Sequence, residues 1–299
     1  MPPGAAALSS TPLSPSCPPT SASTSWTAAT ASSSVACTRG NESYVVCNPA
    51  TEEWAVLPHP CRAAGEVGTM RLGFDAAVSS HFHVFVLLVD AKFSHYLTGV
   101  DVYSSATGVW VHKEERWDGT SSLADPWSAT VFVHGYLYFR TACGQQRPCL
   151  AAVDTKGEKQ PSLDTPRGLF CGDLNLGFMQ QSQGCLHYAS LDMDGDDWDV
   201  QLEVYALEGK ANKEWVLKHR VSAEHVQHFN GVTQRYFEWI TIDPECNSIF
   251  SVYGYEQTLR RYDMDGRQRD ARELRSLGEG HIPYLPYVPL YSELESLCK

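Results

Sequence analysis

The chain has 299 residues, of which 43% are hydrophobic and 19% are charged, so it is able to bury a sizeable core. Its formal net charge is −12, which argues against a nucleic-acid interface, because such an interface needs a basic face. The longest uninterrupted apolar run covers residues 84–89, far short of the roughly 18 residues that a membrane helix needs, and we expect it to form a buried strand.

The first forty residues differ in composition from the rest of the chain. Residues 1–36 consist almost entirely of Ser, Thr, Ala and Pro, and the first charged side chain is Arg39. This composition predicts a disordered, low-complexity segment over residues 1–40. The segment lacks the basic start and apolar centre of a secretory signal, so we expect a cytoplasmic or nuclear protein with reduced thiols.

A strand-plus-turn phrase recurs along the chain about every fifty residues. It first covers residues 44–54 and returns at 100–110, where Thr107 and Trp110 repeat Thr51 and Trp54. Weaker copies follow at residues 150–157, 202–215 and 259–266. We take five residues as equivalent positions of the repeats, with spacings of 56, 50, 52 and 57 residues: Asn48, Ser104, Asp154, Ala206 and Asp263. A period of this length built from strands is typical of propeller blades, and kelch-type blades are the closest in length.

A strand hairpin precedes each of the later copies. These hairpins cover residues 71–89, 130–140, 176–190 and 239–253, with turns at Ser79-Ser80, His134-Gly135, 181–184 and 244–247. Two inner strands followed by two outer strands make one four-stranded blade. The sequence therefore predicts an all-β, kelch-like β-propeller over residues 41–299, with four clear blades and a partial first blade at 44–57.

Several short motifs are specific enough to indicate a family. They are Val-Cys-Asn-Pro-Ala-Thr at residues 46–51 with Trp54 and Leu57-Pro58, Phe74-Asp75 with Ser-Ser-His-Phe-His-Val at 79–84, Val102-Tyr103-Ser104-Ser105, and Pro-Tyr-Val-Pro-Leu-Tyr at 286–291. Together they resemble the F-box-associated domains of plant F-box proteins, in particular the grass members, over about residues 41–299. The resemblance implies the substrate-recognition propeller of an SCF-type (Skp-cullin-F-box) E3 ubiquitin ligase receptor, with an unknown target protein as its partner.

Residues 1–40 depart from the family pattern. The family carries an F-box, which docks the Skp adaptor and through it the cullin, and this segment has no amphipathic helical pattern. The resemblance thus implies target recognition but not ligase docking by residues 1–40. We hypothesise a frameshifted gene model, because residues 26–36 can be encoded so that another frame gives Cys-Asn-Gly-Leu-Leu-Leu, the strand that the family places before the first phrase.

One acidic stretch matches part of a calcium-binding loop. Asp192, Asp194, Asp196 and Glu203 fall at loop positions 1, 3, 5 and 12, but Asp197 stands at position 6, where the turn needs Gly. We expect a solvated acidic hairpin loop rather than a metal site. The pairs His81/His83 and His225/His228 lack a third ligand, and we expect ordinary packing or surface histidines.

The sequence contains none of the common catalytic motifs, so we expect a non-catalytic binding module without a cofactor or metal. One alternative is a propeller enzyme, a hydrolase or oxidase, which would need His, Asp or Glu side chains converging on the central axis. Another is a truncated, pseudogene-like product with an exposed sheet edge.

The remaining candidates for a binding site are tryptophans. Trp54, Trp110 and Trp215 occupy equivalent places in the repeats, and we expect them to pack blade against blade. Trp117 differs, because it lies in the long connection 116–127, and Trp is enriched at binding hot spots. Trp117 is our candidate for a partner contact.

Overall fold

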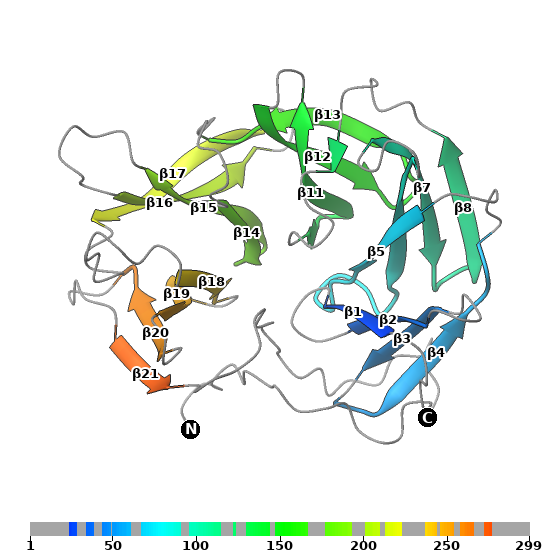
Figure 1. Ribbon diagram of the computed structural model, residues 1–299, viewed down its shortest axis with the longest axis horizontal. Helices are drawn as coiled ribbons and strands as arrows, with labels where there is room; N and C mark the ends of the chain where they lie inside the picture. Colours follow the sequence, from blue (N-terminus) through cyan, green and yellow to red (C-terminus); the bar gives the residue numbers. More distant parts are fainter. Residues whose placement is uncertain are drawn as a thin grey trace. The chain divides into compact units, whose positions relative to one another are not determined.

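The computed structural model describes most of the strands and their hairpin turns. The described residues are 24–28, 34–38, 44–48, 50–60, 67–90, 96–114, 122–123, 130–143, 147–166, 177–192, 201–209, 213–222, 237–243, 246–253, 258–265 and 272–276. They form 21 β-strands and, in these ranges, no helix (Figure 1). The prediction of an all-β chain is confirmed.

The chain divides into two compact units, residues 1–170 with 285–299, and residues 171–284. The first unit holds three antiparallel sheets. Sheet 1 contains β1 (Thr24–Ala28), β2 (Ser34–Thr38), β3 (Tyr44–Asn48) and β4 (Glu53–Leu57). Sheet 2 contains β5 (Val67–Gly73), β6 (His83–Val89), β7 (Leu97–Ser104) and β8 (Val109–Glu114). Sheet 3 contains β10 (Val131–Val133), β11 (Tyr136–Cys143), β12 (Arg147–Asp154) and β13 (Lys159–Asp164), and β9 (Ser122–Leu123) pairs with β11.

The second unit holds two further antiparallel sheets. Sheet 4 contains β14 (Gly177–Ser182), β15 (Cys185–Asp192), β16 (Gln201–Glu208) and β17 (Glu214–Ser222). Sheet 5 contains β18 (Phe237–Ile242), β19 (Ser248–Tyr253), β20 (Thr258–Asp263) and β21 (Arg272–Ser276). In every sheet four strands follow chain order, which is the arrangement of a propeller blade, and β9 of sheet 3 lies outside this order.

The first sheet corrects one prediction. The sequence predicted a partial first blade after a segment without regular structure, but β1 and β2 lie inside residues 1–40 and complete a four-stranded sheet with β3 and β4. Val35 of β2 stands opposite Val46 of β3. Composition missed these strands because pairing along the edge of β3 uses backbone groups, and Ser, Thr and Ala supply those as any residue does.

The predicted hairpins are confirmed, in part to the residue. β6 begins at His83 and β19 at Ser248, as the turn residues before them indicated. The turns His134-Gly135 and Gln183-Gly184 each have two residues with positive φ, at 53° and 80° and at 50° and 71°. Two such residues define a type I′ turn, whose twist matches that of the flanking strands.

One repeat equivalence needs correction. Asn48, Ser104, Asp154 and Asp263 are the last residues of β3, β7, β12 and β20, but the corresponding end of β16 is Glu208, two residues after Ala206. The turn that follows β16 is one residue longer than those that follow β3, β7 and β12, and no side-chain pattern marks where the strand ends.

The central strand of sheet 2 is buried on both faces. Val84, Val86 and Leu88 belong to a core cluster shared with sheet 1, whereas Phe85, Leu87 and Val89 belong to a second cluster shared with sheet 3. Successive strand residues point to opposite faces, so one apolar run serves two cores. Each fully buried side chain of this size stabilises the fold by roughly 1.5–3 kcal/mol. The predicted buried strand at residues 84–89 is confirmed.

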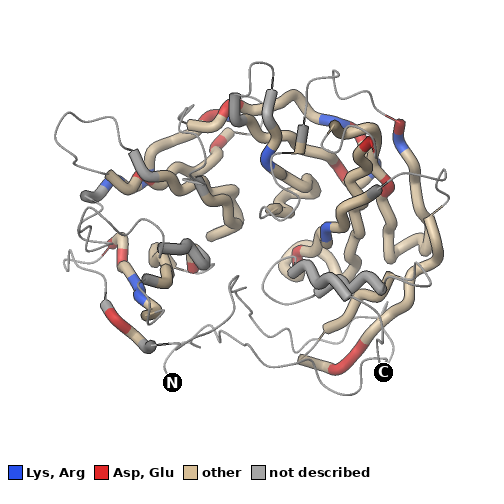
Figure 2. Tube along the Cα trace, in the orientation of Figure 1, with Lys and Arg blue, Asp and Glu red and all other residues tan. Residues whose placement is uncertain are grey.

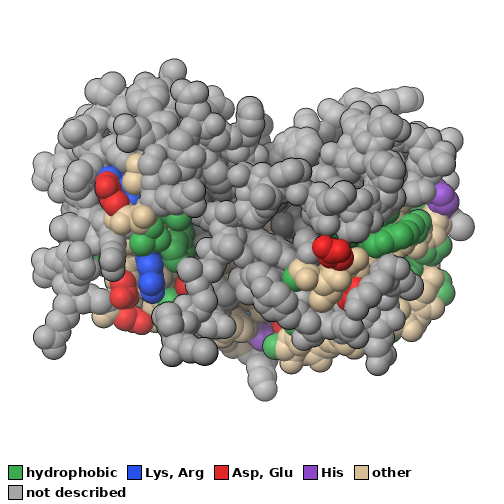
Figure 3. All heavy atoms as spheres, turned by 90° about the horizontal axis from the view of Figure 1, so that it is seen from below, with side chains coloured by type: hydrophobic (Ala, Val, Ile, Leu, Met, Phe, Trp, Pro, Cys, Tyr) green, Lys and Arg blue, Asp and Glu red, His purple; other side chains and the backbone are tan. Residues whose placement is uncertain are grey.

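Charged residues of both signs are interspersed along the described strands (Figure 2). Hydrophobic side chains also reach the surface, as the face in Figure 3 shows. The described examples include Val109 and Val111 of β8, and Val216 and Leu217 of β17.

The cysteines divide into two states. Cys47, Cys185 and Cys246 are free thiols, as the sequence suggested. Cys149 on β12 is disulfide-bonded, which the expectation of reduced thiols did not foresee. Spacing along the chain does not reveal which thiols the strands bring within the short distance that a disulfide needs.

Candidate binding surface

The hairpin turns at one end of each sheet carry exposed side chains. We call these segments the hairpin turns: they join the first strand of a sheet to the second, and the third to the fourth. Their exposed residues include Glu52, Val78, His134, Lys156 and Gln183. Loops held on a rigid sheet are where binding proteins place their contact residues.

An aspartate or asparagine caps many of these turns. Its side-chain oxygen accepts a hydrogen bond from a backbone N–H two to four residues later, which is the geometry of an Asx turn. The acceptors and their donors are Asn48 with Ala50 at 3.1 Å, Asp75 with Ala77 at 3.1 Å, Asp154 with Lys156 and Glu158 at 2.8 Å each, Asp243 with Cys246 at 3.2 Å, and Asp263 with Asp265 at 3.0 Å. The turns are therefore fixed by their own side chains.

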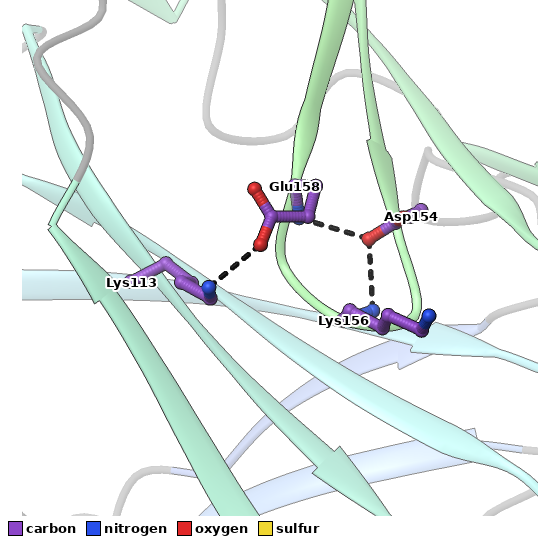
Figure 4. A network of polar contacts seen from close by, with 4 residues as sticks. All are labelled: Lys113, Asp154, Lys156 and Glu158. Atoms are coloured by element: carbon purple, nitrogen blue, oxygen red, sulfur yellow. Dashed lines mark hydrogen bonds and ion pairs between the residues drawn. The ribbon is translucent and has the colours of Figure 1, made fainter.

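The turn of sheet 3 at residues 154–158 also contacts sheet 2. Nζ of Lys113 on β8 donates to Oε1 of Glu158 at 2.6 Å, while Asp154 holds the turn closed (Figure 4). Gly157 has φ of 83°, and a Cβ there would lie 2.8 Å from Cγ of Lys113. The lysine stem thus packs directly on the glycine.

Two turns of sheet 2 are joined to each other. The N–H of Phe82 donates to Oγ of Ser105 at 2.9 Å, and the N–H of Ser105 donates to the backbone oxygen of Phe82 at 3.0 Å. Between sheets 1 and 2, Nε1 of Trp110 donates to the backbone oxygen of Pro58 at 2.6 Å.

In the second unit, polar side chains join the turns of sheets 4 and 5. Oγ of Ser182 donates to the backbone oxygen of Asp243 at 2.6 Å, and Nε2 of Gln183 donates to Oδ1 of Asn247 at 2.6 Å. Nδ2 of Asn247 donates in turn to Oδ2 of Asp265 at 2.7 Å. These turns present amide and carboxylate groups, the kind of surface that forms hydrogen bonds with a protein partner.

A cysteine lies beside this group but is not activated. Nη2 of Arg261 is 3.6 Å from Sγ of Cys246 and 3.0 Å from Oγ of Ser248. Burial raises the pKa of the Cys246 thiol despite this cation, which disfavours the thiolate that a nucleophile requires.

A comparison with models of protein families matches this chain to the F-box associated beta propeller domain over residues 10–276. The chain belongs to the F-box associated β-propeller domain family. This agrees with the motifs at residues 46–51 and 79–84, and it includes the strands β1 and β2 in the matched region.

Two further comparisons give no more specific information about this F-box associated propeller. A comparison with curated proteins found no match. Among solved structures, one similar chain comes from a structural and mechanistic study of two prolyl endopeptidases, with 13% identity and a TM-score of 0.43. The similarity covers 83% of this chain and 34% of that one, so the chain spans about a third of that structure's length.

The candidate contact residue of this F-box associated propeller, Trp117, lies outside the described residues, as do His225 and His228. Asp194, Asp196 and Asp197 of the acidic stretch lie outside them as well. The described part of the chain contains no helix that could span a lipid bilayer.

The last residue of the calcium-loop match has a structural role. Glu203 is fully buried in sheet 4. Its carboxylate accepts hydrogen bonds from the Tyr205 hydroxyl at 2.6 Å and from Nε of Arg220 at 2.7 Å. Because these bonds engage the carboxylate inside the sheet, Glu203 stabilises the pairing of β16 with β17.

His83 packs against an aromatic ring of sheet 3. His83 stacks on Phe132 with ring centroids 6.3 Å apart, and burial together with nearby His81 lowers the pKa of His83. Within the described ranges, no three His, Cys, Asp or Glu side chains come together in a way that could hold a metal ion.

The repeat tryptophans behave as packing residues where a contact is defined. Trp110 packs against the core shared by sheets 1 and 2, with its ring 6.0 Å from that of Tyr44 and 5.3 Å from that of Tyr103. Trp215 lies 5.9 Å from Tyr188 within sheet 4. The sequence missed the turn caps Asp75 and Asp243 and the Gln183–Asn247 link, although an Asp at the end of a predicted strand signals such a cap.

Proposed function

We propose that this chain is the target-recognition propeller of an SCF-type E3 ubiquitin ligase receptor, a non-catalytic module that binds an unknown target protein. Membership of the F-box associated propeller family over residues 10–276 carries the proposal. The capped hairpin turns support it, because they present polar side chains from a fixed backbone, and binding from a preorganised surface costs less ordering entropy.

The proposal includes the remaining partners and the compartment. The Skp adaptor and the cullin join through an F-box in the full gene product, and the protein acts in the cytoplasm or nucleus. Recognition belongs to the propeller, for which the sequence indicates residues 41–299, and Trp117 contributes a contact.

Affinity capture tests the proposal. The tagged full chain is expressed in cells of its own organism, with and without proteasome inhibitor, and the captured proteins are identified by mass spectrometry. We expect at least one specific protein whose recovery rises with inhibitor and falls several-fold in the Trp117→Ala variant. The matched control is Trp215→Phe, which keeps an aromatic ring against Tyr188 and should leave capture unchanged. Recovery of no inhibitor-sensitive protein by a folded chain would contradict the proposal.

A further inference from the structure

The outer strands of the sheets differ in how they are protected against pairing with another strand. In β13, β17 and β21 the register shifts relative to the neighbouring strand, between Leu150 and Ala152, Val204 and Tyr205, and Leu259 and Arg260. In each case the extra residue is on the outer strand, which is a bulge. Bulges on edge strands twist the edge away and hinder further pairing.

β8 lacks this protection. It pairs with β7 in unbroken register from Gly99 opposite Glu114 to Ser104 opposite Val109. Among the described strands, β8 is the last of its sheet and pairs with β7 alone (Figure 1). It also contains no proline, in contrast to Pro161 of β13.

The side chains of β8 leave an apolar strip at this edge. Val109 and Val111 are two residues apart and therefore share a face, and they are 56% and 43% exposed. Two of the neighbouring polar side chains are already engaged, because Lys113 is bound to Glu158, and His112 lies 2.6 Å from the buried carboxylate of Asp101. Glu114, at the end of the strand, is 91% exposed. β4 is also unbulged, but its end residues Glu53 and Leu57 are buried, which leaves a shorter accessible edge.

We propose that the β8 edge binds an extended segment of a partner protein, which adds to sheet 2 as a fifth strand with apolar side chains at alternate positions. Strand addition takes its affinity from backbone hydrogen bonds and its specificity from alternate side chains. The segment's apolar residues lie beside Val109 and Val111. This deepens the proposed function, since it names the form in which a target is recognised.

The size of the edge favours a peptide segment over a second copy of the chain. Six strand residues span about 20 Å, whereas a stable protein–protein interface buries roughly 1,200–2,000 Å². Two exposed valines and one strand edge fall short of that area, but they match a short linear segment.

Selection and peptide binding test the proposal. A phage library of random ten-residue peptides is selected on the immobilised full chain, and the enriched peptide is labelled for fluorescence polarisation. We expect apolar residues at alternate positions. The Val109→Lys/Val111→Lys double variant should bind about tenfold more weakly, because lysines guard edge strands and two cross-strand pairs are lost. The matched control is Val216→Lys/Leu217→Lys on the bulged β17, which should bind like the wild type.

A second readout separates strand addition from general hydrophobic adhesion. A strand directs every second residue's backbone groups toward its neighbour, so N-methylation of one alternate set of peptide amides should abolish binding and methylation of the other set should not. Equal effects of both sets would overturn the proposal, as would equal binding by the β8 double variant or the absence of any enriched peptide. A dimer in sedimentation that the β8 double variant dissociates would assign the edge to a second copy instead.

These outcomes are independent of those for the proposed function. Inhibitor-sensitive capture that survives the β8 double variant would leave the receptor role standing and remove β8 as its binding edge. Peptide binding at β8 without any inhibitor-sensitive target would support the β8 edge as a binding site and contradict the receptor role.

Discussion

The indole N–H of Trp110 donates a hydrogen bond to the backbone oxygen of Pro58, and this 2.6 Å contact joins residues that are 52 positions apart in the chain. Trp110 belongs to the outer strand of sheet 2, whereas Pro58 follows the outer strand of sheet 1. The repeated Trp thus connects its own repeat to the residue that follows the outer strand of the previous repeat. Trp110 belongs to the repeated phrase and Leu57-Pro58 to a family motif, and the structure brings Trp110 and Pro58 into contact.

Replacing this tryptophan tests the connection. Trp110→Phe keeps a ring against Tyr103 but removes the donor, and we expect the unfolding free energy to fall by about 1 kcal/mol. Urea unfolding followed by circular dichroism measures the change. Val111→Thr, an exposed substitution on the same strand, should change it by less than about 0.5 kcal/mol. Equal effects of both substitutions would contradict a specific role for the indole N–H.

The Gly157 turn gives a second stability prediction. Gly157→Ala combines a left-handed backbone with a Cβ 2.8 Å from Cγ of Lys113, so we expect a loss of about 2 kcal/mol or more in thermal or urea unfolding. Gly108→Ala is the matched control, because Gly108 also has a positive φ of 69° but no atom within 4 Å of an added Cβ. Its loss should be about 1 kcal/mol.

A double variant isolates the contact itself. In a Lys113→Ala background the crowded Cγ is absent, and Gly157→Ala should then cost no more than Gly108→Ala does. If Gly157→Ala lowers the unfolding free energy equally in both backgrounds, crowding against the Lys113 stem does not contribute to that loss.

The buried carboxylate of Glu203 gives a third prediction. Arg220→Ala removes an ion-pair partner from a carboxylate that has no exposed surface, and we expect a loss of about 2 kcal/mol. Arg220 is itself half-exposed, so solvent screening keeps the loss below that of a fully buried pair. Adding Glu203→Gln should recover part of the stability, because no uncompensated charge is left. Strictly additive losses in this double-mutant cycle would contradict the pairing.

Acid should destabilise the fold through its histidines. Burial lowers the pKa of His83, His187 and His219, so the folded state binds fewer protons than the unfolded state. The contribution of these histidines to stability should therefore be constant above the unfolded histidine pKa of about 6.5 and fall as pH drops below it. His83→Phe should reduce the slope of unfolding free energy against pH between about pH 7.5 and 5.5, because it removes one of the groups whose pKa burial lowers. An unchanged slope in His83→Phe would contradict this assignment.

The sequence predicted the strands well where the pattern of side chains determines their position. The uninterrupted apolar run at residues 84–89 and the His134-Gly135 turn are local signals, and the structure follows them. It failed at β1 and β2, because Ser, Thr and Ala carry no alternation and those strands depend on pairing with β3. The repeat position assigned to Ala206 was two residues too early for a related reason, since no capping residue marks the end of β16 at Glu208.

The candidate site was harder to predict because its contacts cross between repeats. The Lys113–Glu158 and Gln183–Asn247 pairs are 45 and 64 residues apart, and no spacing rule connects them. The absence of bulges in β8 is likewise a property of pairing register, which becomes visible when β7 and β8 are aligned residue by residue.

Ubiquitin transfer to a captured protein tests target recognition most directly. The full chain, joined behind an F-box and assembled with the Skp adaptor, the cullin and its RING subunit, is incubated with the protein recovered by affinity capture. The account predicts that this protein is ubiquitinated, and that excess chain without the F-box competes and slows the reaction. Efficient capture without any F-box-dependent ubiquitination, under conditions where a known receptor modifies its own target, would contradict it.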